Sequence, residues 1–402
     1  MIGARADHDA SHDANHEKGH DIMKESALGR ILITGTGLFT PPDSITNEDL
    51  VESLSAANER WNATHAEAIE RGELAPRDAP SVAFIRKASG IGHRHVMEKT
   101  GILDPERMRP HLPLRGEDEL SIQAEICLAA AKEALAQAGR GGSDVDAVIV
   151  GCSNLQRAYP AVAIEVQAAL GVDGFAYDMN VACSSATFAI QNAVDALRAG
   201  HARRVLVLNP EITSGHNNFE LREFHFIFGD ACTAVLLEAE EHAGPGEAWE
   251  VLGTRLATKF SNNIRNDAGY LNRCEDGERD PHELVFRQNG RQVYREVCPM
   301  VAEHVRAHLE QAELPLAEVK RLWLHQANLG MNKLISKLLL GREVEEDMAP
   351  VILDEYANTS SAGSVIAFHK HREGLEAGDL GVLCSFGAGY SVGSVLLRKR
   401  EG

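Results

Sequence analysis

The sequence predicts an α/β fold made of two copies of one module that pack together as a pseudo-dimer. Short apolar strands alternate with Ala-rich helices along the chain, which is the pattern of an α/β protein. The same order of strands, helices and turns recurs at an offset of about 175 residues. Each copy also ends in a Phe-Gly turn followed by an apolar strand. These observations predict two equivalent halves rather than two unrelated domains.

The repeat can be followed along the sequence. Residues 145–154 (VDAVIVGCSN) align without gaps on residues 319–328 (VKRLWLHQAN), and both segments begin with an apolar strand. In the first copy this strand is preceded by the helix 124–139 and followed by a helix from Ser184 to near Gly200, the strand 205–208 and the last strand 228–237. In the second copy the matching elements are the helix 301–314, a helix from Ser360 to near Gly378, the strand 381–384 and the last strand 386–397. Residues at matched positions should therefore occupy equivalent places in the two halves.

We divide the chain into a tail and two halves. Residues 1–28 are polar and His-rich, and we expect a disordered tail there. Its histidines recur every four residues, so on a helix they would share one face and could bind a transition metal, which is the alternative interpretation. The N-terminal half is expected to cover residues 29–242, with an insertion at 52–80, and the C-terminal half residues 243–402.

Composition and charge exclude several classes of protein. The chain has 40 Lys and Arg against 59 Asp and Glu, a net charge of −19, which argues against general nucleic-acid binding. No apolar run is long enough for a transmembrane helix and the polar N-terminus is no secretory signal, so we expect a cytoplasmic protein. The seven cysteines are scattered without a C-x-x-C pair, which favours free thiols over disulfides or a zinc site.

Three residues at strand ends and helix starts are candidates for catalysis. Cys183 lies just before a helix, whose positive end is expected to lower the pKa of the thiol and favour a thiolate nucleophile. His325 ends the apolar strand 321–325, and Asn358 occupies the position that matches Cys183 in the repeat. A buried Cys, a core His and an N-cap Asn are the ordinary alternatives. Their equivalent positions in a duplicated module favour acyl transfer, with the Cys as nucleophile and the other two as hydrogen-bond donors.

Five ordered motifs contain or surround these residues. They are Ala182-Cys183, Phe228-Gly229-Asp230, His325-Gln326-Ala327-Asn328, Asn358-Thr359-Ser360 and Gly387-Ala388-Gly389-Tyr390-Ser391-x-Gly393-Ser394. Together they resemble the ketoacyl-acyl-carrier-protein synthase III family of the thiolase superfamily, over roughly residues 30–400. The resemblance implies a thiolase-like fold, in which a duplicated βαβαβαββ module forms a five-layered α-β-α-β-α pseudo-dimer. It also implies a homodimer.

The resemblance implies a two-step condensation. Cys183 would accept an acyl group from acyl-CoA or another acyl thioester. Malonyl-acyl carrier protein would then lose carbon dioxide while His325 and Asn358 stabilise the enolate, giving 3-ketoacyl-acyl carrier protein in fatty acid or related lipid biosynthesis. The backbone amides of Cys183 and Ala388 would form the oxyanion hole of the acylation step. No metal or other cofactor is implied.

Other binding residues follow from the same resemblance. Substrate contacts are implied for Tyr159, Arg222, Phe228, Gly290, Arg295, Asn328 and Gly387. Tyr159 would cross the dimer interface into the acyl pocket of the partner. Because the chain is acidic while a carrier protein and coenzyme A are anionic, we expect a local basic patch, with Lys333 and Lys337 as candidates.

Departures from the family pattern leave the acyl donor open. The segment that holds adenine in the family has Phe84 and Ala88 in place of its Trp and Arg, and Gly330 stands where an arginine is usual. A longer acyl-CoA or another acyl carrier is therefore an alternative to the usual short primer. Two other functions also stay open: an acyltransferase or condensing enzyme of quinolone, pyrone or resorcinol type metabolism, and a non-catalytic partner that binds acyl carriers.

Overall fold

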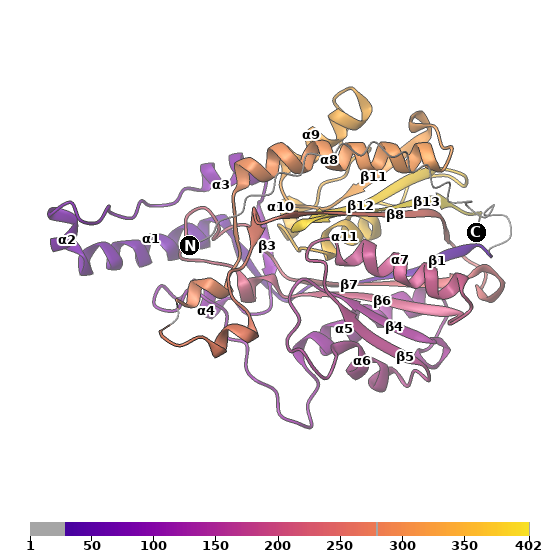
Figure 1. The fold of residues 1–402 in the computed structure, drawn as a ribbon, viewed down its shortest axis with the longest axis horizontal. Coiled ribbons are helices and arrows are strands. Elements are labelled where there is room, and N and C mark those ends of the chain that lie inside the picture. Colours follow the sequence, from indigo (N-terminus) through magenta and orange to yellow (C-terminus); the bar gives the residue numbers. More distant parts are fainter. Residues whose placement is uncertain (1–28, 279, 402) are drawn as a thin grey trace, which may run out of the picture.

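The structure, a computed structural model, describes residues 29–278 and 280–401, and it has the predicted α-β-α-β-α layers (Figure 1). Within the described residues nine strands join into one sheet in the order β11 (Val319–Leu324), β12 (Leu380–Gly387), β13 (Gly389–Lys399), β8 (Trp249–Ser261), β1 (Ile31–Phe39), β7 (Ala231–Ala239), β6 (Arg204–Glu211), β4 (Ala147–Gly151) and β5 (Phe175–Met179). Four short strands of the described chain form two separate pairs, β2 (Asp43–Thr46) with β3 (His93–Val96) and β9 (Ile264–Arg265) with β10 (Arg287–Gln288). The two halves meet at a short antiparallel contact between β1 and β8, where Leu32 faces Glu250 and Ile33 faces Trp249. The sheet thus bends into two layers, one for each copy of the module (Figure 1).

Helices cover both outer faces of the sheet layers and fill the space between them. Helices α5 (Ile122–Gln137) and α6 (Val162–Leu170) cover the first layer, and α8 (Gly290–Gln311) and α9 (Leu329–Leu340) cover the second. The central helices α7 (Ser185–Arg198) and α11 (Ala362–Lys370) contact strands of both halves. Each of these two helices begins just after a candidate catalytic residue.

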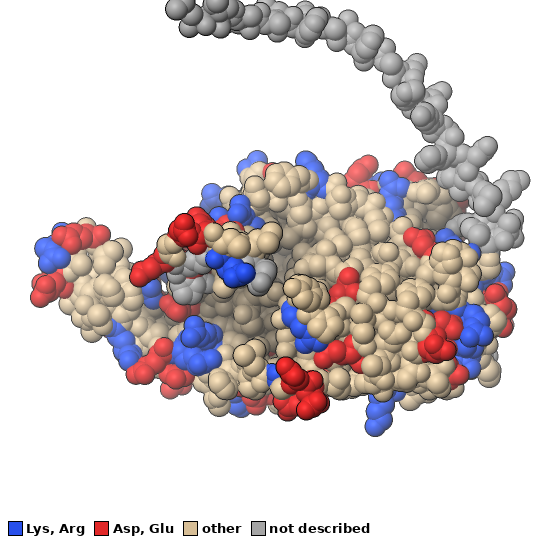
Figure 2. Space-filling view, turned by 60° about the horizontal axis from the view of Figure 1, so that its bottom comes forward, with Lys and Arg blue, Asp and Glu red and all other residues tan. Residues whose placement is uncertain are grey.

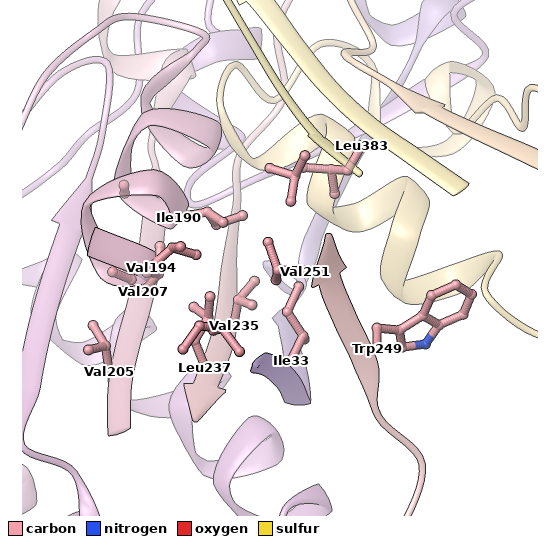
Figure 3. Close-up of a cluster of buried hydrophobic side chains, with 14 of the residues drawn as sticks. Ile33, Ile190, Val194, Val205, Val207, Val235, Leu237, Trp249, Val251 and Leu383 are labelled. Atoms are coloured by element: carbon pink, nitrogen blue, oxygen red, sulfur yellow. The ribbon is translucent and has the colours of Figure 1, made fainter. Parts of the chain in front are cut away.

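The core of the central layer joins the two halves. Ile33, Val207 and Val235 from the N-terminal half pack there with Val251 and Leu383 from the C-terminal half, and all five are buried (Figure 3). Separate apolar clusters lie beneath the outer helices of each half. Burial of apolar surface at about 25 cal/mol per Å² makes this shared layer the main attachment between the two copies.

The first copy has the order β1-α5-β4-α6-β5-α7-β6-β7, which is the predicted βαβαβαββ module. The second copy has the order β8-α8-β11-α9-α11-β12-β13 apart from short pieces, so within the described residues it has no strand equivalent to β5. The chain there runs beside β11, with the Leu322 amide donating to the Met348 carbonyl at 2.7 Å, and then forms the short helix α10 (Leu353–Tyr356).

Two helix limits differ from the prediction. The helix expected to run to Gly378 ends at Lys370, and the chain then turns back to β12. The helix expected over 301–314 is the C-terminal part of α8, which starts at Gly290 where the Asn289 side chain accepts from the Gln292 amide. The helix runs through Pro299, although proline removes a helical hydrogen bond, so the expected start at residue 301 lies inside it.

The segment predicted as an insertion forms an arm that projects from the body of the protein (Figure 1). The arm consists of the long helix α1 (Asn47–Thr64), the short helix α2 (Ala66–Glu70) and a returning segment that leads to α3 (Val82–Ser89). Its base also carries β2 (Asp43–Thr46), β3 (His93–Val96) and α4 (Thr100–Leu103). The domain limits 29–242 and 243–402 stay predictions, as does the extent of the insertion.

The predicted His-rich tail, residues 1–28, lies outside the described residues. In the described part of the chain, no helix is long and apolar enough to cross a membrane. No group of three or more His, Cys, Asp or Glu side chains in residues 29–278 and 280–401 is arranged to hold a metal ion. All seven cysteines are described, and all are free thiols.

Candidate active site

Cys183 lies between the edge strand β5 and the first residue of α7. The turn that carries it is fixed by two hydrogen bonds, from the Ala182 amide to the Asn180 side chain at 2.9 Å and from the Ser185 hydroxyl to the Ala182 carbonyl at 2.7 Å. Ala182 has a φ of +46°, a conformation that is costly for a non-glycine residue. The backbone is therefore held in an unfavourable form directly before the thiol.

The environment of the Cys183 thiol raises its pKa to about 11, because burial disfavours the thiolate. The Ser360 hydroxyl and the backbone amides of Cys183 and Ala388 oppose this effect, while the Glu211 carboxylate adds to it. The prediction of a lowered pKa is wrong, since burial outweighs the helix N-terminus. In the unliganded protein Cys183 is therefore a neutral thiol at pH 7.

His325 directly follows β11, as predicted, and its side chain is buried. Its amide donates to the Cys384 carbonyl at 2.8 Å, and its ring packs edge-on against Phe386, with 5.1 Å between ring centroids. Burial lowers the pKa of His325 to about 4, with the Ser360 carbonyl in opposition. The imidazole is therefore neutral at pH 7 and carries one N–H donor and one acceptor nitrogen.

Asn358 is held in place by hydrogen bonds to the Phe228 turn and to Ser360. Its backbone pairs with the Phe228 turn, because the Asn358 amide donates to the Ile227 carbonyl at 3.0 Å and the Gly229 amide donates to the Asn358 carbonyl at 3.1 Å. Its side-chain oxygen accepts from the Ser360 amide at 2.9 Å. This arrangement leaves the side-chain NH₂ group of Asn358 to donate to a ligand.

Ser360 links the three candidate residues. It follows Asn358 by two positions, its hydroxyl acts on the pKa of Cys183, and its carbonyl acts on that of His325. Ser360 has a φ of +50°, so this turn also holds an unfavourable backbone conformation. The Ser360 Oγ and the His325 Nδ1 are buried without a hydrogen-bond partner among the described residues. Unpaired buried polar atoms are rare, and here they mark a place where a ligand can bind.

Two adjoining cavities lie beside Cys183 and Asn358, whereas His325 borders neither of them in the described chain. The first encloses about 560 Å³ up to its open mouth and is lined by Cys183, Ser360, Ala388 and mostly apolar side chains that include Phe228 and Phe286. The second, of about 1060 Å³, has Asn358 in its lining. Phe286 borders both cavities, so the cavity at the Cys183 thiol and the cavity at Asn358 are neighbours.

Gly387 and Ala388 form the wall opposite the thiol. A side-chain carbon built on Gly387 would lie 2.6 Å from the Cys183 Cβ and 3.2 Å from its sulfur, so only glycine allows this approach. The Ala388 amide is among the groups that lower the pKa of Cys183, which places this donor beside the sulfur. A backbone N–H at this position can stabilise negative charge that develops on an atom bonded to the sulfur.

Two further predicted residues line the second cavity. Gly290 begins α8, and Asn328 caps α9 by accepting from the Gly330 amide at 2.8 Å. The Asn328 side-chain nitrogen donates to the Ala88 carbonyl, which ties α3 to α9. Arg295 is exposed and does not border this cavity, whereas its neighbour Tyr294 does.

Other predicted binding residues lie on the surface. Arg222 stacks over the Phe84 ring at 5.2 Å and forms an ion pair of 3.6 Å with Asp78 from the arm. Tyr159 is 82% exposed and borders neither cavity in the described chain. Lys333 and Lys337 are both exposed on α9, and Lys337 forms an ion pair of 2.7 Å with Glu343.

The sequence interpretation missed Glu211, the last residue of β6. Its carboxylate is completely buried behind the site and contacts serines from both halves. The sequence carries one signal for it, a carboxylate three residues after the apolar strand 205–208, near the strand end where functional groups gather in α/β folds.

Known proteins match this chain in sequence and in fold. A family model described as 3-oxoacyl-[acyl-carrier-protein] synthase III matches residues 177–259, and the model of its C-terminal part matches residues 309–399. The chain is 59% identical over 349 residues to the beta-ketodecanoyl-[acyl-carrier-protein] synthase of Pseudomonas aeruginosa, which covers 87% of this chain and 100% of the relative. It is 30% identical over 372 residues to the beta-ketoacyl-[acyl-carrier-protein] synthase III of Cereibacter sphaeroides, covering 92% and 99%.

A solved structure shares the fold over nearly the whole chain. The 3-oxoacyl-[acyl-carrier-protein] synthase III of Aquifex aeolicus superposes with a TM-score of 0.69 at 25% identity, covering 92% of this chain and 99% of that one. The matched segments contain the Cys183, His325 and Asn358 positions. The chain therefore belongs to the beta-ketoacyl-[acyl-carrier-protein] synthase III family of condensing enzymes.

Proposed function

We propose that this enzyme transfers an acyl group from an acyl thioester to Cys183 and condenses it with malonyl-acyl carrier protein, with loss of carbon dioxide. The observation that carries the proposal is that a thiol and a primary amide border two adjoining cavities, while a neutral imidazole lies beside Ser360, which lines the first cavity. Ser360 is the common neighbour of all three groups. A nucleophile with separate donors for developing negative charge suits acyl transfer.

The first step forms the acyl-enzyme. The Cys183 sulfur attacks the carbonyl carbon of the donor while its proton passes to the neutral His325, and the amides of Cys183 and Ala388 stabilise the oxyanion. The carbonyl then re-forms, the donor thiolate leaves, and it takes the proton from His325. Because the thiol is neutral in the free enzyme, the proton must leave during the attack rather than before it.

The second step forms the new carbon–carbon bond. The malonyl carboxylate leaves as carbon dioxide, and its bonding electrons form an enolate of the carrier thioester. His325 and the NH₂ group of Asn358 donate to the enolate oxygen, and the enolate carbon attacks the acyl-Cys183 carbonyl. Collapse of the oxyanion releases the Cys183 thiolate and gives the 3-ketoacyl product. Donors that are already in place cost no reorganisation as charge develops.

We propose an eight-carbon acyl group as the substrate. The relative at 59% identity is named for a β-ketodecanoyl product, and malonyl condensation supplies two of the ten carbons of such a chain. Apolar side chains dominate the lining of the cavity at Cys183, including Phe228, Ile264, Leu284 and Phe286. Such a lining favours an alkyl chain because its burial removes apolar surface from water.

We propose coenzyme A as the carrier of that acyl group. The supporting observation is the Phe84–Arg222 stack, since Phe84 also packs edge-on against Phe226, which lines the second cavity. Phe84 and Arg222 can each stack on a purine, with Phe84 in the place of the family's Trp, and the Arg222 guanidinium would have to move off the Phe84 ring to admit one. A comparison of octanoyl-CoA with octanoyl-pantetheine as acyl donors distinguishes recognition of coenzyme A from recognition of its pantetheine arm alone.

We propose that Lys333 and Lys337 contribute to docking of the acyl carrier protein. The face in Figure 2 shows basic and acidic side chains interspersed, so recruitment of an acidic partner must depend on a local group of cations. Lys333→Glu is expected to raise the KM for malonyl-carrier protein at low salt without changing acylation by octanoyl-CoA. An unchanged KM removes Lys333 from the docking surface. The cytoplasmic location, the homodimer and the role of Tyr159 in it stay predictions.

The test of the proposed function combines purified enzyme, octanoyl-CoA and malonyl-acyl carrier protein. We expect 3-ketodecanoyl-carrier protein and carbon dioxide from the wild type, and no ketoacyl product from Cys183→Ala with an unchanged melting temperature. Acyl-Cys183 formed without decarboxylation of malonyl-carrier protein would favour a condensing enzyme with another acceptor. Absence of both acylation and condensation with every acyl-CoA tested would refute the proposal.

A further inference from the structure

Glu211 is a buried carboxylate that neither step of the reaction uses. Its exposed fraction is 0%, and none of the ion pairs among the described residues includes it. Burial raises its pKa, although its hydrogen bonds to Ser153 and Ser361 oppose the effect. A buried carboxylate without a cation is costly and persists only where several donors surround it. Its retention directly behind the site therefore calls for a role.

Five donors of the described chain surround this carboxylate. Three come from the N-terminal half, including the Cys152 thiol at 3.5 Å from Oε2, and two come from the C-terminal half. Oε1 accepts from the Ser153 amide at 3.0 Å, from the Ser361 amide at 3.1 Å and from the Ser361 hydroxyl, while Oε2 accepts from the Ser153 hydroxyl at 2.5 Å. The Ser361 hydroxyl also lies 3.3 Å from the Gly151 carbonyl at the end of β4. Glu211 thus connects the ends of two strands of the N-terminal half to the start of α11 in the C-terminal half.

The attachment point is the turn that carries Asn358. The turn runs from Asn358 to Ser361, and its first end is fixed by backbone pairing with the Phe228 turn. Its second end is fixed by the bonds from Ser361 to Glu211. Between these ends, the φ of +50° at Ser360 is a conformation that relaxes when the surrounding contacts are lost. The position of the Asn358 NH₂ group therefore depends on both ends.

We propose that Glu211 is a positioning residue, whose carboxylate holds the Asn358–Ser361 turn so that the Asn358 amide meets the enolate oxygen opposite Cys183. The inference rests on the proposed function, because Asn358 serves the malonyl step. It predicts that loss of Glu211 impairs decarboxylation and condensation far more than acylation of Cys183. A purely structural role would impair the two steps together.

The substitutions Glu211→Gln and Glu211→Ala separate the hydrogen-bonding role of the side chain from its negative charge. Glutamine keeps an acceptor oxygen at the Oε1 position, where both serine amides donate, and places its NH₂ group where the Ser153 hydroxyl can rotate to accept. Alanine removes every acceptor. Glu238→Ala is the matched control, because Glu238 is also completely buried but pairs with Arg140 and Arg204 at the other end of the same strands.

The experiment first loads each variant with octanoyl-CoA and measures the acylated fraction by intact mass. It then follows a single turnover with malonyl-acyl carrier protein. We expect Glu211→Ala to lower the rate of the turnover with malonyl-acyl carrier protein by about 10- to 100-fold, because misplacing a catalytic group by about 1 Å has an effect of that size. Acylation by octanoyl-CoA should change by less than about threefold. Glu211→Gln should recover the second rate to within about threefold of the wild type, and Glu238→Ala should keep both rates.

Three results would overturn the inference. They are a Glu211→Ala enzyme with wild-type turnover, a Glu211→Gln enzyme as impaired as Glu211→Ala, and equal losses in both steps. Where Glu211→Ala does not fold, Ser361→Ala removes one bond to the carboxylate, and we expect a loss of about five- to tenfold in the second step alone. An unchanged second rate in Ser361→Ala also contradicts the inference. A wild-type enzyme that acylates but never decarboxylates malonyl-carrier protein refutes the proposed function instead.

Discussion

The approach of Gly387 to Cys183 gives a prediction with a steric origin. In Gly387→Ala the new Cβ would lie 2.6 Å from the Cys183 Cβ and 3.2 Å from the sulfur. Two carbon atoms normally approach to about 3.5–4.0 Å, so the overlap is about 1 Å. Gly387 ends β12 and pairs with Ser391 of the neighbouring strand, so the sheet resists movement and the Cys183 turn must shift instead.

The magnitude follows from that displacement. A shift of about 1 Å in a nucleophile costs about 100-fold in rate, and overpacking of this kind costs about 1–3 kcal/mol of stability. We therefore expect Gly387→Ala to acylate Cys183 about 100-fold more slowly while it remains folded. Rapid-quench mass spectrometry with octanoyl-CoA measures the rate, and thermal unfolding measures the stability.

The control for this variant is Gly269→Ala. A Cβ on Gly269 meets no atom within 4 Å, and the φ of −150° at this residue is open to alanine. We expect wild-type acylation from this control. Acylation of Gly387→Ala within about threefold of the wild type would refute the argument, because it would mean that the wall of the site yields without cost.

Three other predictions concern pH and the donor. The rate at which iodoacetamide alkylates Cys183 should keep rising with pH up to about pH 11, whereas the rate for an ordinary thiol levels off above about pH 9.5. A plateau near pH 8 would contradict the raised pKa of Cys183. Five histidines, four of them buried and His216 partly exposed, have lowered pKa values. The unfolded chain therefore takes up protons below about pH 6.5 before the folded chain does. Stability that is present above that pH is lost as the pH falls toward 4, at up to about 1.4 kcal/mol per pH unit per proton. They are His216, His225, His304, His308 and His325. A melting temperature that is flat from pH 4 to 6.5 would contradict this assignment. Phe84→Ala should raise the KM for octanoyl-CoA by about tenfold and leave that for octanoyl-pantetheine unchanged, since the ring would contact only the adenine; equal KM changes would count against the coenzyme A site.

The sequence predicted the fold because duplication is visible in the order of elements. The motif around Cys183, the strand end at His325 and the helix start at Asn358 each have local signals, and the repeat indicated that they are related positions. The predicted limits of the helices α8 and α11 were less accurate. A proline inside one helix interrupts its pattern, and tertiary contacts rather than a sequence signal end the other.

The electrostatics of the site could not be predicted in this way. The helix N-terminus at Cys183 is a local feature, but the burial that outweighs it is produced by Gly387, Phe228 and other residues far away in the sequence. Glu211 is a further case, because nothing near it in the sequence identifies its partner Ser361, which lies 150 residues away. Contacts between halves exist only in the folded chain.

The central claim is that Cys183 carries the acyl group into a decarboxylative condensation, and one measurement tests it most directly. Intact mass spectrometry follows the enzyme through sequential addition of octanoyl-CoA and malonyl-acyl carrier protein. The account predicts that one octanoyl group appears on the peptide containing Cys183, disappears on addition of the malonyl-carrier, and is recovered in 3-ketodecanoyl-carrier protein. An octanoyl adduct on another residue, or an adduct on Cys183 that persists after malonyl-carrier addition, would contradict it.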